Sequence, residues 1–317
     1  MHPLPPFMGG LLALPLCAIA SLGSVASAQS LGALTDYSVI VSGNLSTNSD
    51  IEGRTLVGGN LTSSSSANFG IKLQNQVSSS DLVLRVQGNI VSGNAINLNA
   101  GSLEIGGSTN GRTVNYNGGG SLVSNSSADY SDIISGLTSA SQSLAMYTPN
   151  STAFLDPSNP GQPGPFKLNA TPDSTGLAVF SVNGADIFGD SKVQQIELFA
   201  NSAADILINV AGTVINWDFG NIVGDLTQEA WRERVVWNFY EATEINFNSK
   251  NMMGQVLAPN ATITTSGNID GSVFAKNLIT TSEVHLPGYD GNIVVPEPSS
   301  AMLMLLGSAA ALLRRKR

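Results

Sequence analysis

Histidine and cysteine, the side chains that most often carry nucleophilic and metal chemistry, are almost absent from this chain. The two histidines are His2 and His285, and the single cysteine is Cys17. Because His2 lies in the N-terminal segment, a multi-histidine metal site is excluded. A Ser-His-Asp triad would have to use His285, yet the chain has no Gly-x-Ser-x-Gly elbow. We therefore expect no catalytic residue, and we expect His285 at a strand end or in a loop.

Four aspartates in glycine-bearing loops are the best candidates for an acidic cluster. They are Asp186, Asp190, Asp218 and Asp225. Paired carboxylates hydrolyse glycosidic bonds in many enzymes, and the two partners can be distant in the chain. A polysaccharide-cleaving enzyme on a β-helix therefore stays open as an alternative. The chain has neither an EF-hand loop nor the nonapeptide calcium repeat, so we expect no cofactor and leave a weak calcium site open.

Two groups of residues could form a binding surface instead. All three tryptophans fall between Trp217 and Trp237, beside Phe219, Phe239 and Tyr240. They could stack sugars, but a buried aromatic plug in the core is the better interpretation. Several threonines suggest the flat array of an ice-binding solenoid, but two threonine-bearing strands do not make an array, and threonine is also simply a good strand residue. These are Thr262, Thr264, Thr265, Thr280 and Thr281.

The elements that must position these residues are short strands. Runs of β-branched residues alternate with Gly-Asn steps, whose residues tolerate positive φ in tight turns. The Gly-Asn-apolar pattern begins at Gly43, Gly59, Gly88, Gly220, Gly267 and Gly291. Its intervals are unequal, which an irregular solenoid tolerates because each coil need only stack on its neighbours. We expect a mainly β chain, an irregular parallel β-helix, with a β-sandwich as the alternative. Gly43, Gly59, Gly88 and Gly267 should lie at turns, several of them with positive φ.

One α-helix is expected, at about residues 128–147. Apolar residues recur there at helical spacing, and Ser126 or Ser127 could cap its start. Gly136 weakens the helix by about 1 kcal/mol relative to alanine, so packing alongside the solenoid must hold it. Residues 149–165 contain five prolines and predict an extended loop, and residues 228–234 predict at most one helical turn.

A set of motifs resembles the choice-of-anchor A family of bacterial surface proteins, over about residues 31–291. The matching residues are Gly43, Asn44, Glu52, Gly53, Gly58, Gly59, Asn60, Trp237, Asn238, Gly254, Leu257, Ala258, Pro259, Gly271 and His285. The chain has Tyr289 where that family usually has phenylalanine. The resemblance implies a surface-exposed or adhesive protein.

The N-terminal residues 1–28 predict a signal peptide. An apolar run extends from Gly9 to Gly23, and Ala26-Ser27-Ala28 is a small-x-small cleavage site. The residues before Cys17 are a poor lipobox. The whole chain carries a formal net charge of −9, and four of its 14 basic residues are its last four, so the remainder is more acidic still. An acidic body argues against nucleic acid or an anionic membrane as partner.

The C-terminal residues 294–317 resemble a PEP-CTERM sorting signal, which exosortases process. Pro296, Glu297 and Pro298 precede an apolar run from Ala301 to Leu313, and the chain closes on Arg314, Arg315, Lys316 and Arg317. As a helix that run spans about 20 Å, less than the roughly 30 Å hydrocarbon core of a bilayer. We therefore expect transient membrane insertion with the basic tail in the cytoplasm; an ordinary tail anchor is the alternative.

Together these features predict an exported, non-enzymatic protein of the envelope, surface or matrix of a Gram-negative bacterium. Residues 29–293 form its solenoid domain. We expect it to be structural or adhesive and to associate with extracellular polysaccharide or biofilm. The alternatives are the polysaccharide-cleaving β-helix enzyme and the ice-binding solenoid.

Overall fold

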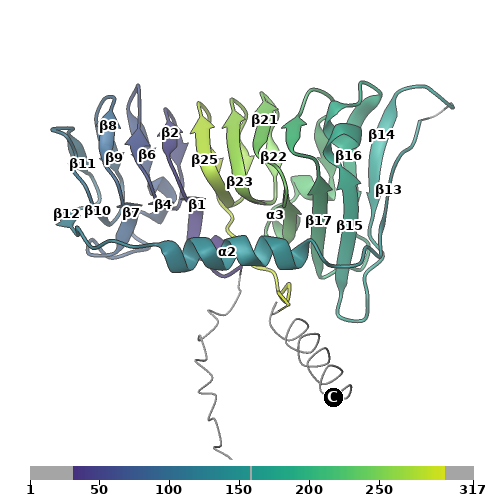
Figure 1. The fold of residues 1–317 in the computed structure, drawn as a ribbon, viewed down its shortest axis with the longest axis horizontal. Helices are drawn as coiled ribbons and strands as arrows, with labels where there is room; N and C mark the ends of the chain where they lie inside the picture. The colour runs from purple at the N-terminus through teal and green to yellow at the C-terminus, as the bar shows by residue number, and fades with distance from the viewer. Residues whose placement is uncertain (1–30, 158, 297–317) are drawn as a thin grey trace, which may run out of the picture.

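The computed structural model describes residues 31–157 and 159–296, and there the strands stack into a β-solenoid with one long helix along its side (Figure 1). Three faces surround its core. Face a contains β12 (Leu122–Ser124), β10 (Ser102–Ile105), β7 (Leu82–Val86), β4 (Arg54–Val57), β1 (Tyr37–Val41), β25 (Val273–Thr280), β23 (Gln255–Thr265), β20 (Val235–Asn238), β17 (Asp205–Ala211) and β15 (Leu177–Asn183), in that order.

Face b contains β8 (Ile90–Ser92), β5 (Leu61–Thr62), β2 (Leu45–Thr47), the second halves of β25 and β23, β21 (Glu244–Asn248) and β18 (Val214–Asn216). Face c contains β11 (Val114–Tyr116), β9 (Ile96–Leu98), β6 (Ala67–Phe69), β3 (Asp50–Ile51), β26 (Val284–His285), β24 (Ile269–Asp270) and β22 (Met252–Met253). A four-stranded sheet of β13 (Thr152–Leu155), β14 (Gly164–Asn169), β16 (Val193–Phe199) and β19 (Ile222–Gly224) completes the coils at one end.

The predicted parallel β-helix is confirmed. Neighbouring strands on all three faces run parallel, for example β4 with β7 on face a and β6 with β9 on face c. Strands β23 and β25 bend from face a to face b, and their pairing is irregular between Ala258 and Thr262, at that corner. The alternative β-sandwich, with two antiparallel sheets face to face, is wrong.

The coils are not stacked in chain order. The first strand, β1, lies between β4 and β25, so the N-terminal coils meet the C-terminal coils in the middle of the solenoid. From β1 the chain winds outward to β12 at one end. It then passes along the helix to the other end and winds back from β15 to β25. Figure 1 shows this as purple strands beside yellow-green ones at mid-length.

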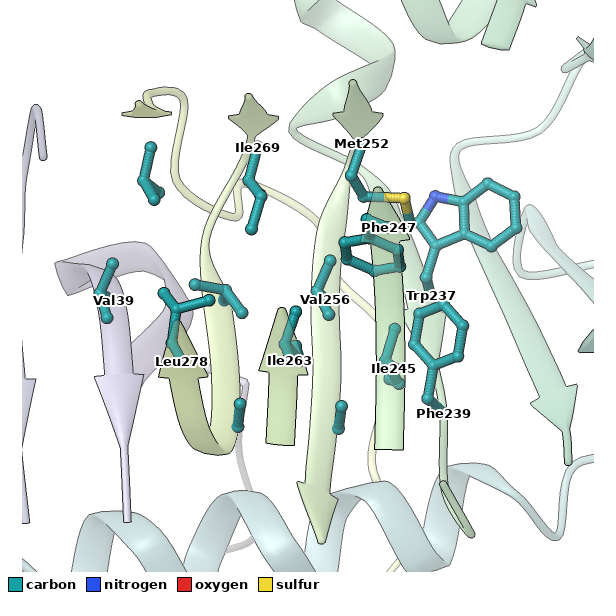
Figure 2. Close-up of a cluster of buried hydrophobic side chains, with 14 of the residues drawn as sticks. Val39, Trp237, Phe239, Ile245, Phe247, Met252, Val256, Ile263, Ile269 and Leu278 are labelled. Atoms are coloured by element: carbon teal, nitrogen blue, oxygen red, sulfur yellow. The ribbon is translucent and has the colours of Figure 1, made fainter. Parts of the chain in front are cut away.

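The interior of the solenoid is apolar, and its widest part holds the aromatic cluster. Trp217, Trp237, Phe188, Phe239 and Phe247 are fully buried, and neighbouring ring centroids lie 5.2 to 6.1 Å apart. Figure 2 shows part of this cluster beside the aliphatic core. The tryptophans 217 and 237 are therefore core residues, as the plug interpretation expects, and they offer no surface on which a sugar could stack.

The long helix, α2 (Ser131–Leu144), packs lengthwise against the outer side of face a. Its buried residues Leu137, Ala140 and Leu144 belong to a second apolar cluster, which includes Ile40 and Phe274 from the sheet. The predicted helix alongside the solenoid is present, but it starts and ends three residues inside the expected bounds. The expected serine caps are wrong, because the carboxylate of Asp129 accepts the Ser131 N–H at 3.0 Å instead.

Buried polar side chains fix both ends of α2 on the sheet. Before the helix, the Tyr130 hydroxyl donates to Glu104 at 2.9 Å, and Glu104 also accepts from Arg85 Nε at 2.8 Å. At the other end, the Ser141 hydroxyl donates to Asn238 Oδ1 at 2.6 Å, and Asn238 Nδ2 donates back to the Ser141 carbonyl at 2.9 Å. The helix therefore has one register along the solenoid.

The predicted positive φ at Gly43, Gly59, Gly88 and Gly267 is wrong, since none of the four has a left-handed backbone. These glycines lie at turns for a different reason, which is close approach between coils. A Cβ atom on Gly59 would lie 2.7 Å from the Gly43 carbonyl oxygen, and one on Gly267 would lie 2.1 Å from the Lys250 carbonyl oxygen. The neighbouring coil leaves no room for a side chain.

The remaining helical segments are short. They are α1 (Ala33–Asp36), η1 (Ile71–Leu73), η2 (Ala185–Gly189), η3 (Asp225–Thr227) and α3 (Glu229–Arg232). The predicted loop over residues 149–165 is interrupted by strand β13 and by the start of β14. Within the described part of the chain, no helix is long and apolar enough to cross a membrane.

Candidate binding faces

The Gly-Asn steps form ladders at the corners of the solenoid. The Asn44 side-chain oxygen accepts the Asn60 N–H at 2.8 Å, Asn60 Oδ1 accepts the Asn89 N–H at 2.8 Å, and Asn89 Oδ1 accepts the Ser108 N–H at 2.9 Å. Each asparagine thus satisfies a corner amide that no strand partner reaches. Asn277 extends the ladder into the C-terminal coils by accepting the Asn44 N–H.

Face b presents a continuous row of outward side chains across six strands. Register pairs Thr62 with Ser46, Ser46 with Ile279, Ile279 with Thr264, Thr264 with Asn246, and Asn246 with Asn216. Adjacent strands lie about 4.8 Å apart, so hydroxyl and amide groups repeat at that spacing. Ile279, at 44% exposure, is the apolar member of the row. We call these six residues the face b row.

The five threonines considered for an ice-binding array are divided between this outward face, the interior and a turn. Thr264 is exposed and Thr262 is half-buried, both pointing outward on β23. Thr265 and Thr280 point inward and are almost fully buried, and their hydroxyls donate to the carbonyls of the next turn, at 2.9 and 2.8 Å. Thr281 lies beyond the end of β25. Two of the five threonines therefore stabilise turns through their hydroxyl groups.

The four candidate aspartates do not form one cluster. Asp186 and Asp190 line a cavity of about 350 Å³ between β13 and the end of β15. Asp218 accepts from Asn248 Nδ2 at 3.0 Å, and Asp225 accepts the Ala200 N–H at 2.8 Å, so both fix local loops. Among residues 31–157 and 159–296, no group of three or more His, Cys, Asp or Glu side chains is arranged to hold a metal ion.

Face c carries a charged cluster where the first coil meets the last one. His285 Nδ1 and Nε2 each lie 2.6 Å from a carboxylate oxygen, of Asp270 and Glu283 respectively. Arg232 Nη1 lies 3.1 Å from the other Asp270 oxygen. Glu52, on the first coil, accepts the Leu286 N–H at 2.8 Å. These five side chains join β3, β24 and β26.

The electrostatics of this cluster favour the protonated form of His285. Burial alone would lower the pKa of His285, but the hydrogen bonds to Glu283 and Asp270 outweigh it and raise the pKa. When it is protonated, the imidazole donates from both nitrogens to the two carboxylates, and neither nitrogen is then free to act as a base. His285 lies at a strand end, as predicted. Glu283 lies only two residues before His285, whereas Asp270 lies on the neighbouring strand β24, so only the stacking of the coils brings Asp270 to the imidazole.

The residues of the family motif stabilise the fold through burial, hydrogen bonds and close packing between coils. Trp237, Leu257, Ala258 and Pro259 are buried. Asn238 holds α2, and Asn44 and Asn60 form the corner ladder. A Cβ atom on Gly53 or Gly58 would clash with the neighbouring coil, and Gly254 and Gly271 have φ of +104° and +147°. These residues of the family motif therefore maintain the stacking of the coils and the docking of α2.

The sorting residues lie mostly outside the described part of the chain. Ala26, Ala28, Glu297, Pro298, Arg314, Arg315, Lys316 and Arg317 are all outside it. Pro296 is the last described residue and is exposed.

Two family models match the chain. Residues 30–286 match the model described as "Putative Ice-binding-like adhesive domain", and residues 294–317 match the PEP-CTERM protein-sorting motif. These matches do not confirm the choice-of-anchor A name. No curated protein matches the chain.

Solved structures similar to this chain include three ice-binding proteins. One, from the Antarctic ascomycete Antarctomyces psychrotrophicus, is 13% identical, with 82% of this chain and 99% of that chain covered and a TM-score of 0.39. A DUF3494 domain of ice-binding protein 1 from Shewanella frigidimarina is 14% identical, with 84% and 98% covered and a TM-score of 0.36. A third, from an Antarctic biological consortium, is 13% identical, with 89% and 94% covered and a TM-score of 0.33.

Proposed function

The chain belongs to the ice-binding-like adhesive domain family, and on that premise we propose that it is a non-enzymatic adhesive protein that holds extracellular polysaccharide through face b. Its PEP-CTERM motif implies export and processing by an exosortase-type enzyme. The proposal includes cleavage after Ala28, loss of the tail from near Pro296 onward, and a place in the envelope or biofilm matrix of a Gram-negative cell.

The observation that carries the proposal is the face b row. Five of its six residues bear uncharged hydroxyl or amide groups, each able to donate and accept hydrogen bonds. Sugar hydroxyls need such partners, and exposed Ile279 can contact the apolar side of a sugar ring. A single contact of this kind is weak, but a polymer that crosses several coils sums many contacts through multivalency.

The negative charge of the domain determines which polysaccharides it can bind. Glu244 points outward beside Thr262 on face b, and none of the residues in the face b row is basic. Uncharged polysaccharide is therefore the preferred ligand, and an acidic one would be repelled. The described residues hold no three-ligand metal arrangement, so we propose that binding persists after calcium is chelated.

Ice binding is the second candidate, favoured by the outward threonines of β23. Against it, the neighbouring strands place Asn246 and Ile279 beside Thr264, and Glu244 and Asn277 beside Thr262. A charged and chemically mixed face matches a regular ice lattice poorly. The polysaccharide-cleaving alternative has less support, since Asp218 and Asp225 do not line the cavity that contains Asp186 and Asp190.

Co-sedimentation with a panel of neutral and acidic polysaccharides tests the proposal directly. Thr264→Lys should reduce retention of a neutral polysaccharide at least several-fold, because it places a long charged chain in the middle of the face b row. Asn115→Lys, at an exposed position on face c, is the matched control and should bind normally. Equal binding by both variants would refute the role of face b.

The same proteins separate the alternatives. Thermal hysteresis that Thr264→Lys abolishes, without any glycan retention, would establish the ice-binding reading. Release of reducing ends or unsaturated sugars, abolished by Asp186→Asn with Asp190→Asn, would establish an enzyme. Deletion in the native host should reduce biofilm formation and polysaccharide retention, and a complemented strain should restore both.

A further inference from the structure

The last described residues form a fixed strap on the outer side of face a. This C-terminal strap, residues 289–296, begins where the Tyr289 N–H donates to the Leu34 carbonyl at 3.0 Å. Further on, the Asn292 N–H donates to Asp205 Oδ1 at 3.0 Å. The sorting motif therefore starts from a rigid point on the folded domain.

The strap also packs through apolar side chains. Tyr289, Ile293 and Val295 are nearly fully buried in the cluster between face a and α2. Leu31, the first described residue, belongs to the same cluster. Both ends of the domain thus leave from the side that carries α2, whereas face b lies on another side of the solenoid (Figure 1).

The two most exposed large apolar side chains of the described residues lie at this exit. Val294 is 73% exposed and Met146 is 68% exposed. They are joined through Tyr147, whose hydroxyl donates to the Val294 carbonyl at 2.7 Å. We call Met146 and Val294 the exit pair. Exposed apolar groups beside a membrane-directed segment match the boundary between headgroups and acyl chains.

The short segment between the strap and the apolar run limits how far the domain can lie from that run. Only residues 297–300 separate Pro296 from the apolar run that begins at Ala301. A fully extended chain advances at most about 3.6 Å per residue, so Pro296 stays within about 20 Å of the start of that run. While the run is inserted, the α2 side of the domain must remain close to the bilayer.

From these observations we infer that the exit pair and the neighbouring end of α2 rest on the lipid bilayer while the C-terminal signal holds the chain, so that face b points away from the cell. The occupant is the membrane surface itself, and the contact is apolar. The inference rests on the sorting motif in the proposed function but not on the ligand of face b. It means that polysaccharide can be bound before the tail is removed.

Lipid-quenching measurements on the full chain test this orientation. In a Cys17→Ser background, a single fluorophore is attached at Gln142→Cys on α2, Thr264→Cys on face b or Asn115→Cys on face c, and the protein is reconstituted in phosphatidylcholine vesicles that contain doxyl-labelled phosphatidylcholine. All three positions are polar and exposed. Quenching at residue 142 should exceed quenching at 264 and 115 by about threefold or more, because only that side approaches the acyl boundary.

A second set of variants tests the exit pair. Met146→Ser with Val294→Ser should lower the quenching at residue 142 at least twofold, and Val214→Ser, an exposed apolar control on face b, should leave it unchanged. All these positions are on the surface, so urea unfolding should show unchanged stability.

Three outcomes would overturn the inference. Equal quenching at residues 142 and 264 would mean that the domain has no fixed orientation. Unchanged quenching in the exit-pair variant would show that Met146 and Val294 make no apolar contact with the bilayer. If quenching is absent, and if the exosortase removes the tail of that variant more slowly in cells, the exit pair contacts the processing enzyme instead of the bilayer. None of these outcomes affects glycan retention by face b, which is measured without membranes.

Discussion

Ile40 on the first strand lies in register beside Phe274 on the last long strand, although most of the chain separates them. This pairing closes the N-terminal and C-terminal coils into one solenoid. Both side chains are fully buried beneath the helix α2 and the terminal segments. The centre of the solenoid is therefore the place where the N-terminal coils meet the C-terminal coils, and its stability depends on both.

Shortening a buried side chain at this junction should destabilise the whole domain. Ile40→Ala removes buried methyl groups and should lower the free energy of unfolding by about 2–5 kcal/mol. Ile279→Ala makes the same chemical change at an exposed position on face b. It should alter the free energy of unfolding by less than about 0.5 kcal/mol. Urea unfolding followed by circular dichroism measures both. Two separate transitions in the wild-type protein would contradict closure into one cooperative unit.

The corner ladder predicts a specific side-chain requirement. Asn60→Ala leaves the Asn89 N–H without its acceptor and should cost about 1–3 kcal/mol. Asn60→Asp keeps an acceptor oxygen at the same place and should retain most of the stability. The control is Asn115→Ala, which loses only an exposed side-chain contact to Asn97. If Asn60→Asp is as unstable as Asn60→Ala, the acceptor oxygen is not what matters.

Two glycines should respond to alanine in opposite directions. Gly59→Ala places a Cβ atom 2.5 Å from Asn44 Oδ1 and 2.7 Å from the Gly43 carbonyl oxygen, so the coils must separate and the protein is destabilised. Gly136 in α2 has open space around it, and Gly136→Ala should stabilise the domain by up to about 1 kcal/mol through helix propensity. Thermal unfolding of the two variants gives the comparison, and a stabilising Gly59→Ala would disprove the close-approach argument.

The docking of α2 depends on Asn238. Asn238→Ala removes the acceptor of the Ser141 hydroxyl and the donor to Asn209 Oδ1 at 2.8 Å, leaving buried polar groups unpaired. We expect a loss of about 1–3 kcal/mol for each such group, and faster hydrogen exchange in residues 131–144. Exposed Asn216→Ala serves as the control. Unchanged exchange protection of the helix would show that apolar packing alone holds it.

Stability should fall as pH rises through the titration of His285. Its folded-state pKa is raised, so the protonated form stabilises the native state. This contribution is fully present below the unfolded pKa of about 6.5 and is lost as pH rises through the higher folded value. His285→Gln should remove that part of the pH dependence. Urea unfolding between pH 5.5 and 8.5, compared for the two proteins, is the measurement. Parallel curves for both would exclude His285 as the titrating group.

The local sequence determined the kind of fold. Unequal Gly-Asn-apolar repeats with short β-branched runs are compatible with a stack of coils, and helical spacing after Tyr130 identified the helix α2. These features are local, because turn chemistry and side-chain alternation depend on residues close in the chain. The C-terminal sorting motif and the predicted N-terminal signal peptide are of the same kind, since composition and order alone define such signals.

Only the tertiary structure decided the order of the coils and the meaning of the glycines. A parallel ladder accepts any strand of suitable length and register, so nothing near Tyr37 specifies that β1 lies between β4 and β25. Gly59 and Asn60 were recognisable as turn residues, but the carbonyl and amide that require them belong to neighbouring coils. The same holds for His285 and Asp270, which stacking brings within 2.6 Å. Contacts between coils depend on three-dimensional register, and that register exists only once the solenoid has closed.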